Sequence, residues 1–338
     1  KLSLIRIVLL VFVMMPGTVF SQTEIKNLVM EGAGMRGLAY CGVFMELEER
    51  GMIEGLEKVG GTSAGAINAL ALSLGYSAAE VYEFVSSTDF QRFNDGKYWF
   101  VGGLNRMQKN FGWYRGDEFL QWLESILQEK TGNKDITFGE MRAAGYKDLY
   151  VTGTCLNKQK LIVFSADTYP DMCVKDAIRI TMSVPLYFEA VFIDENGKVY
   201  DSLEEKDGLD VMVDGGILAN FPIHIFDTYE VDAEGRRQRI PDPHTLGIRL
   251  DSDDQIEEDQ ENHELVSMEI NDISQYIQAF YVLTLETINR RELMEKDWER
   301  TISVSSRGVG PRIKKLSKAD KDMLVSSGRY AAKVYFKD

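Results

Sequence analysis

The sequence predicts an α/β fold with a mostly parallel central sheet, because strand-like and helix-like segments alternate in its first third. An apolar strand pattern at 25–30 precedes an amphipathic helical pattern at 38–51. A second short strand at 56–59 leads directly into a helical pattern at 64–74. Strand, helix, strand, helix in this order favours parallel pairing through right-handed crossovers.

The later segments continue the alternation of strands and helices. Helices are expected at 118–130, 174–182 and 318–335, and strands at 148–154, 160–164, 211–213, 246–250 and 301–305. The acidic stretch 251–261 is expected to be a solvated loop, and 262–297 a long helix with a broken pattern. No linker composition interrupts the chain, so residues 22–338 are expected to form a single domain.

Composition restricts the partners that the chain can have. Hydrophobic residues make up 44% and charged residues 27% of the 338 residues, which are values of a globular protein. Acidic residues outnumber basic ones by 53 to 38, for a formal charge of −15. This charge repels phosphate backbones, so nucleic acid is not expected as a partner. It also opposes electrostatic binding to anionic membranes, so any lipid contact is expected to be apolar.

The N-terminal residues 1–21 are typical of a secretory signal. Lys1 and Arg6 supply positive charge, and residues 7–15 form an unbroken apolar run that is too short to span a bilayer. Cleavage after Ser21 would leave a mature chain beginning at Gln22, exported to the periplasm, the cell surface or the medium. The alternative is an uncleaved anchor or an apolar N-terminal helix.

The three cysteines do not suggest a metal site. Cys41, Cys155 and Cys173 are odd in number and widely spaced, without metal-ligand spacing or a disulfide framework. Cys41 lies within the apolar helical pattern and is expected in the core.

The motif Gly61-Thr62-Ser63-Ala64-Gly65 is a G-x-S-x-G between a strand and a helix. This is the context of a nucleophile elbow, in which the serine occupies a strained turn and the flanking glycines let strand and helix approach. The helix that follows directs its N-terminal amides towards the serine. The alternative is a glycine-rich turn in which Ser63 only caps the helix.

The motif Gly32-Ala33-Gly34-Met35-Arg36-Gly37 also lies between a strand and a helix. As a G-x-G-x-x-G it fits a dinucleotide-binding loop, which needs an acidic residue at the end of the second strand. Glu54 and Glu57 precede that strand, which ends in the serine motif instead. As an oxyanion hole, the loop would direct successive backbone N–H groups at one point. Arg36 would brace the loop, bind a lipid phosphate, or act only as a surface cation.

The third motif, Asp214-Gly215-Gly216, follows the apolar strand at 211–213. Asp before two glycines is often only a turn, but a base at the carboxyl end of a strand fits the edge where α/β sheets gather their sites. Of the three histidines, His224 lies in an apolar setting and is expected to be structural, whereas His244 and His263 lie in loop-like segments. A Ser–Asp dyad is therefore the simplest interpretation.

The three motifs in this order resemble the patatin-like phospholipases, from about Lys26 to the C-terminus. The resemblance includes the helix 38–51, the segment 183–188 and the Asn220-Phe221-Pro222 that follows the aspartate motif. It implies a three-layer α/β/α fold and catalysis without histidine, metal or cofactor. Ala33 replaces the middle one of three glycines that the family commonly has, which costs stability only if φ is positive there. Phe221 replaces a small polar residue and is expected to affect substrate fit.

By this resemblance Ser63 is the nucleophile, Asp214 is the base, and main-chain amides near Ala33 and Gly34 hold the oxyanion. The implied reaction is cleavage of a fatty acyl ester through an acyl-enzyme. The same dyad could pass the acyl group to an alcohol, as an acyltransferase, or the fold could be catalytically silent. A dinucleotide-dependent oxidoreductase is the remote alternative.

An aromatic-rich stretch at 90–114 raises the question of a lipid interface. It contains Phe, Tyr and Trp side chains with poor helical periodicity, interspersed with glycine and asparagine. Such a segment suits a lid or an acyl channel at a lipid or phospholipid surface, with transient contact to a membrane interface. A loop packed on the core is the equal alternative.

Overall fold

The computed structural model describes residues 24–337, apart from 97–98, 263 and 311–314. The expected signal segment 1–21 and His263 lie outside the described residues. Export therefore stays a prediction, which sequencing the N-terminus of the exported chain would test.

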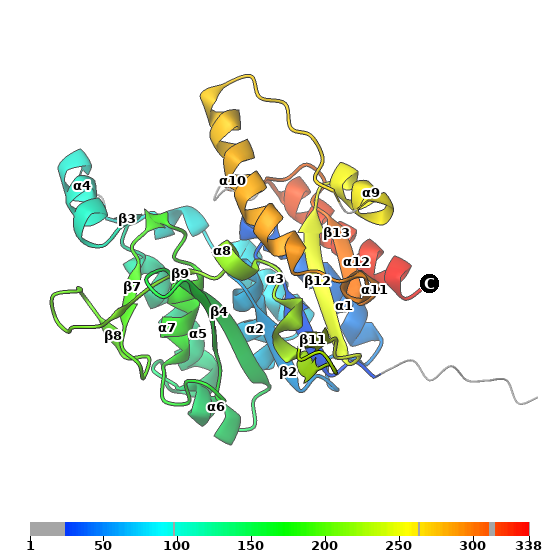
Figure 1. Ribbon diagram of the computed structural model, residues 1–338, viewed down its shortest axis with the longest axis horizontal. Coiled ribbons are helices and arrows are strands. Elements are labelled where there is room, and N and C mark those ends of the chain that lie inside the picture. The colour runs from blue at the N-terminus through cyan, green and yellow to red at the C-terminus, as the bar shows by residue number, and fades with distance from the viewer. Residues whose placement is uncertain (1–23, 97–98, 263, 311–314, 338) are drawn as a thin grey trace, which may run out of the picture.

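The central sheet has the strand order β13-β12-β1-β2-β4-β9-β7-β8, with β5 also paired to β4 (Figure 1). The strands from β13 to β4 are mutually parallel, and the remaining pairs are antiparallel. The parallel strands are β13 (Thr301–Ser305), β12 (Thr245–Asp251), β1 (Asn27–Met30), β2 (Lys58–Gly61) and β4 (Asp148–Cys155). The others are β5 (Lys160–Phe164), β9 (Asp210–Asp214), β7 (Val191–Ile193) and β8 (Val199–Tyr200). The predicted α/β fold with a mostly parallel sheet is confirmed.

The connections between the strands are mainly helical. The helices are α1 (Ala39–Glu49), α2 (Ala64–Ser73), α3 (Ala78–Ser87), α4 (Trp99–Lys109), α5 (Asp117–Thr131), α6 (Phe138–Ala143), α7 (Val174–Thr181), α8 (Gly216–Ala219), α9 (Asp253–Glu261), α10 (Ile273–Arg291), α11 (Glu295–Glu299) and α12 (Lys318–Tyr335). Short 3-10 helices are η1 (Gly34–Leu38), η2 (Phe90–Phe93) and η3 (Ile223–Phe226). Two small sheets pair β3 (Gly112–Tyr114) with β6 (Leu186–Phe188), and β10 (Thr228–Val231) with β11 (Arg237–Ile240).

Helices cover both faces of the sheet. The chain moves in one direction from β1 to β2 and β4, and in the other direction from β12 to β13, so right-handed crossovers put α1 and α2 on one face and α9 to α11 on the other. Helix α12 packs on α1 and β13, and α10 packs on α8. The strands form the buried layer between the two helical layers, and all four residues of β1 are buried. Figure 1 shows α4 and the first half of α10 projecting beyond the sheet.

Two sequence expectations were wrong. The acidic stretch 251–261 is not a solvated loop but contains α9, because Ser252 caps the helix by accepting from the Gln255 N–H, and the buried Gln255 side chain bonds Asp259. The long helix expected at 262–297 begins only at Ile273 and is two helices, α10 and α11, separated by 292–294. Among the described residues, no helix has both the length and the apolar content needed to cross a bilayer.

The aromatic stretch 90–114 also differs from a loop, since it forms η2, α4 and β3. Phe90 and Phe93 pack against each other and against Trp122 of α5, so this part belongs to the core. Phe111 is exposed just after the end of α4. The structure therefore favours core packing for the first part of the segment, and the lid interpretation stays a prediction for the rest.

Candidate active site

Ser63 occupies the tight turn between β2 and α2. Its φ of 52° and ψ of −123° place a non-glycine residue in a region that costs conformational energy. Gly61 and Gly65 make this turn possible, because a Cβ on Gly61 would lie 2.6 Å from the Gly65 carbonyl carbon, and one on Gly65 would lie 2.4 Å from the Met30 oxygen. The strained turn is thus held by close backbone contact between β2, α2 and β1.

Thr62 of the motif, together with Thr181 and Met182, which the sequence analysis did not single out, holds this turn. The Thr62 hydroxyl donates to the Ala219 oxygen at 2.7 Å. The Ser63 N–H donates to Thr181 Oγ1 at 2.9 Å, and the Ser63 hydroxyl lies 3.5 Å from Met182 Sδ. Ser63 is 9% exposed, so the nucleophile candidate is largely buried rather than on the surface.

The glycine-rich loop lies directly beside Ser63. A Cβ on Gly32 would be 3.4 Å from the Ser63 Cβ, and one on Gly37 would be 3.1 Å from the Ala64 Cβ. Ala33 has a φ of −131°, so the side chain that replaces the family's middle glycine causes no backbone strain. The left-handed conformation falls on Gly34, at φ 54°, where glycine is required.

Only part of this loop is available to bind an oxyanion. The Gly32 N–H donates to the Asn220 oxygen at 2.9 Å, and the Arg36 N–H donates to the Ala33 oxygen at 3.2 Å. Among the described residues, the N–H groups of Ala33, Gly34 and Met35 bond no backbone acceptor, so these three remain candidate oxyanion donors. The Arg36 side chain braces the loop, because its Nε donates to the same Ala33 oxygen.

Asp214 is the last residue of β9 and pairs with Gly153 of β4. Its backbone N–H donates to the Ser183 oxygen at 2.9 Å, and its Oδ1 accepts from the Gly216 N–H at 2.7 Å. Gly215 is needed here, since a Cβ would lie 2.2 Å from Thr152 Oγ1. The backbone of Asp214 and one of its carboxyl oxygens are therefore held by hydrogen bonds.

Burial gives the Asp214 carboxyl an unusual affinity for protons. Desolvation raises its pKa from 3.8 to about 7, whereas the Gly216 N–H and the nearby Ser63 hydroxyl act in the opposite direction. The structure thus brings together two side chains that are about 150 positions apart in the sequence, as the dyad interpretation requires. A carboxyl with a pKa near neutrality suits a general base.

Asn220 connects the glycine-rich loop to the aspartate segment. Its carbonyl accepts from the Gly32 N–H, and its side-chain Nδ2 donates to the Gly32 oxygen and to Glu31 Oε1, both at 3.1 Å. The Asn220 N–H in turn donates to Asn289 Oδ1 of α10, whose Nδ2 donates to the Gly216 oxygen at 3.3 Å. Asn289 lies in a helix far along the chain, and no local sequence signal identified it.

Behind this connection lies a buried charge network. Glu31, whose pKa is raised mainly by desolvation, accepts from the Leu250 N–H at 2.8 Å and faces the fully buried Arg249. Arg249 also pairs with Asp251 at 2.8 Å and with Glu286 of α10 at 3.1 Å. The same helix therefore contacts both the network and the segment that follows Asp214.

His224, His244 and Glu57 lie away from Ser63. His224 on η3 is half-buried; burial lowers its pKa, and its charged neighbours are Arg239 and Glu292, so the structural interpretation fits. His244 Nδ1 lies 2.8 Å from the Glu24 oxygen. His244 comes just before β12, so it lies at the amino ends of the parallel strands, whereas Ser63 lies at their carboxyl ends. Glu57 pairs with Lys26, also at the amino ends. No carboxylate closes β2, against the dinucleotide interpretation.

Two further expectations concern side chains outside the dyad. The Phe221 ring is buried beneath Gly247 of β12, 2.5 Å from where a Cβ would stand, and its effect on substrate fit stays a prediction. Cys41 is buried in the core, as expected, and the three cysteines are unpaired. Over the described ranges, no group of three or more His, Cys, Asp or Glu side chains is arranged to hold a metal ion.

Comparison with known proteins agrees with this geometry. A family model described as patatin-like phospholipase matches residues 28–227, which include all three motifs. The chain belongs to this family. The resemblance drawn from the motifs is thereby confirmed.

Individual relatives are similar over the same region. YqhO of Bacillus subtilis (strain 168) is 31% identical over 209 residues, 59% of this chain and 65% of that protein. A protein named "Probable lipid hydrolase 463L", of Invertebrate iridescent virus 6, is 25% identical over 210 residues, 60% of this chain and 64% of that protein. The chain thus spans just under two thirds of the length of these curated relatives. VipD from Legionella pneumophila shares the fold, with a TM-score of 0.59 at 16% identity, over 93% of this chain and 67% of that one.

Replacing Asp214 with asparagine should stabilise the patatin-like protein more at about pH 8 than at about pH 5. The folded-state pKa is raised from 3.8 to about 7, so stability falls as pH rises through this interval, because the unfolded chain releases the proton first. The substituted amide would carry no buried charge above pH 7. Thermal melting of wild type and Asp214→Asn at both pH values measures the difference. The exposed Asp207→Asn is the control, and an equal gain in both variants would contradict the assignment.

Proposed function

We propose that this protein is a serine acyl-hydrolase, a phospholipase A or lipid esterase, that cleaves fatty acyl esters through Ser63 and Asp214. The observation that carries the proposal is the strained Ser63 turn beside the buried carboxyl of Asp214, whose pKa burial raises to about 7. Membership of the patatin-like phospholipase family and similarity to a relative named as a lipid hydrolase support it. This chemistry needs no metal and no cofactor.

The proposed reaction proceeds in two steps. Asp214 takes the Ser63 proton as the serine oxygen attacks the ester carbonyl, and the Ala33 and Gly34 N–H groups stabilise the negative charge on the carbonyl oxygen. Collapse of this intermediate expels the alcohol, which receives the proton from Asp214. A water molecule, deprotonated by Asp214, then attacks the acyl-serine and releases the fatty acid with Ser63 restored. An alcohol in place of that water would make the same dyad an acyltransferase.

We also propose that the protein acts at a neutral lipid surface, through the first half of α10. This half has no charged residue between positions 273 and 285. Large apolar side chains at helical spacing are exposed on it: Ile273 at 73%, Tyr276 at 56%, Phe280 at 64% and Leu283 at 59%. Such a stripe lies on a membrane rather than across it, and it belongs to the helix that packs on α8 beside Asp214. The net charge of −15 opposes both anionic lipid and a second copy of the chain.

A lipid-like fluorophosphonate should label the wild-type protein and neither Ser63→Ala nor Asp214→Asn. The reagent needs the serine alkoxide, and therefore a base to accept its proton. The labelling rate of the wild type should rise with pH through about 7, because Asp214 accepts a proton only when ionised. Gel fluorescence and intact-protein mass measure the adduct. Strong labelling of Ser63→Ala would place the nucleophile elsewhere, and labelling without hydrolysis of any ester would favour the acyltransferase.

Asn289→Ala should lower kcat by about tenfold to a hundredfold with little change in KM, because the segment that carries Asp214, Gly216 and Asn220 would lose its support from α10 and shift relative to Ser63. Steady-state kinetics on a soluble short-chain ester measures both constants. Arg291→Ala, an exposed change on the same helix, is the matched control. A rise in KM at unchanged kcat would show that Asn289 does not position the catalytic groups.

Replacing both Ile273 and Phe280 with serine should weaken binding to phosphatidylcholine vesicles at least about tenfold, because two large apolar side chains would no longer leave water. Vesicle sedimentation measures binding, and hydrolysis of a soluble ester should not change. The control is the double change Tyr330→Ser and Val334→Ser, which removes comparably exposed side chains from α12. A wild type that ignores vesicles but forms a dimer that the α10 changes dissociate would assign the stripe to self-association.

A further inference from the structure

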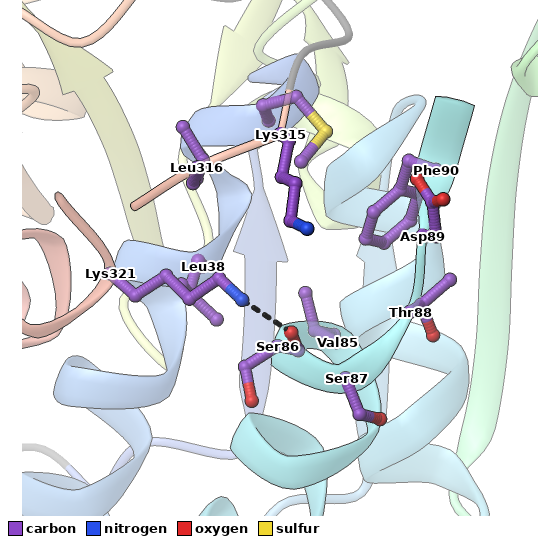
Figure 2. A pocket seen from close by; sticks show the side chains of 11 residues that line it. Leu38, Val85, Ser86, Ser87, Thr88, Asp89, Phe90, Lys315, Leu316 and Lys321 are labelled. Atoms are coloured by element: carbon purple, nitrogen blue, oxygen red, sulfur yellow. Dashed lines mark hydrogen bonds between the residues drawn. The ribbon is translucent and has the colours of Figure 1, made fainter. Parts of the chain in front are cut away.

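A cavity of about 180 Å³ lies beside the glycine-rich loop, between η1, the end of α3 and the segment that leads into α12 (Figure 2). Met35 and Leu38 of η1 form part of its wall. Gly37 in the same short helix contacts the start of α2, since a Cβ there would lie 3.1 Å from the Ala64 Cβ. One turn of backbone therefore separates the cavity from the residue that follows Ser63.

The lining combines apolar, hydroxyl and charged side chains. The apolar ones are Met35, Leu38, Val85, Phe90 and Leu316, the hydroxyls are Ser86, Ser87 and Thr88, and the charged ones are Lys315, Lys321 and Asp89. A cavity of this size holds about six water molecules at their share of liquid volume, which suits a compact polar group better than a long acyl chain. The presence of both charge signs suggests a ligand that carries both.

The two lysines differ in what they contact. Lys321 donates to the Ser86 backbone oxygen at 2.6 Å and so satisfies the end of α3 (Figure 2). Lys315 extends into the cavity, and Figure 2 shows its ammonium group directed into the space between Leu38 and Phe90. Lys315 thus presents a cation to a bound molecule, as a phosphate ligand requires.

Asp89 and Phe90 form the wall opposite Leu38 and Lys321 (Figure 2). One Asp89 oxygen accepts from the Gln91 N–H at 3.2 Å, which caps η2, and this fixes the carboxylate at the cavity rim. A carboxylate next to an aromatic ring attracts alkylammonium groups through charge and through the ring face. Cation and anion sites thus lie on different sides of one small space.

We propose that this cavity binds the headgroup of a zwitterionic phospholipid, with the phosphodiester on Lys315 and the ammonium group beside Asp89 and Phe90. The assignment deepens the proposed lipid hydrolase function, on which it rests, by naming the substrate class. A headgroup without net charge is not repelled by a chain of charge −15, whereas an anionic one is. Binding next to η1 places the attached acyl esters near the glycine-rich loop.

The test is binding of soluble short-chain lipids to the full chain carrying Ser63→Ala, so that turnover does not remove the ligand. Dihexanoyl phosphatidylcholine, dihexanoyl phosphatidylglycerol and dihexanoylglycerol are compared by calorimetry below their micelle concentrations. Lys315→Met should weaken binding of both phospholipids about tenfold and leave dihexanoylglycerol unchanged, whereas Lys315→Arg should retain most of the affinity. Asp89→Asn keeps a capping side chain and should weaken only the phosphatidylcholine, by about threefold to tenfold.

Lys318→Met is the matched control, since Lys318 is exposed three residues away and does not line the cavity. Equal phosphatidylcholine affinity of Lys315→Met and Lys318→Met would overturn the proposal. So would an equal loss for dihexanoylglycerol in Lys315→Met, which would indicate a structural role, or an equal effect of Asp89→Asn on both phospholipids. Failure of the hydrolase proposal is seen separately, as hydrolysis that survives Ser63→Ala, and leaves these binding results interpretable.

Discussion

The arrangement of the site depends on the hydrogen bonds of Asn220. Serine turn, glycine-rich loop and aspartate strand come from three distant parts of the chain, and Asn220 binds the loop through its backbone oxygen and its side chain at once. The absence of a side chain at position 32 follows from this contact, because a Cβ there would lie 2.3 Å from Asn220 Oδ1. Asn289 then ties the same residue to Gly216, so the loop and the proposed base are held as one unit.

This rigidity supports a base that is unfavourable for stability. Burial of the Asp214 carboxyl raises its pKa towards 7, so ionising it at neutral pH costs free energy of folding. The φ of Ser63 adds a local strain of about 1–3 kcal/mol. Both costs fall on the two proposed catalytic residues, and the surrounding hydrogen bonds and close glycine contacts offset them. An unfavourable backbone conformation next to a buried carboxyl is typical of an active site rather than of a structural turn.

Local patterns predicted much of the fold and the chemical part of the site. The strand at 301–305 and the helix at 318–335 lie where periodicity placed them, because each has an alternating or helical pattern with clear ends. The three glycine motifs were recognisable in the sequence, because close backbone approach requires glycine at fixed positions. Non-local contacts leave no such signal: the pairing of Asp259 with Arg290 of α10 has no local pattern, and Asn289 matters only through its contacts with Asn220 and Gly216. The capping box of Ser77 and Glu80 in α3 was a local signal that went unused.

Helix α10 links the two kinds of contact that a lipid hydrolase needs. Its second half is held by buried charges, since Arg290 pairs with Asp259 and Glu286 with Arg249, and by Asn289 at the catalytic segments. Its first half is uncharged and exposes Ile273 and Phe280. Because one helix is stiff over this length, a surface that fixes its exposed half also fixes the orientation of its buried half. The orientation of the site towards lipid would then be a property of the fold rather than of a flexible lid.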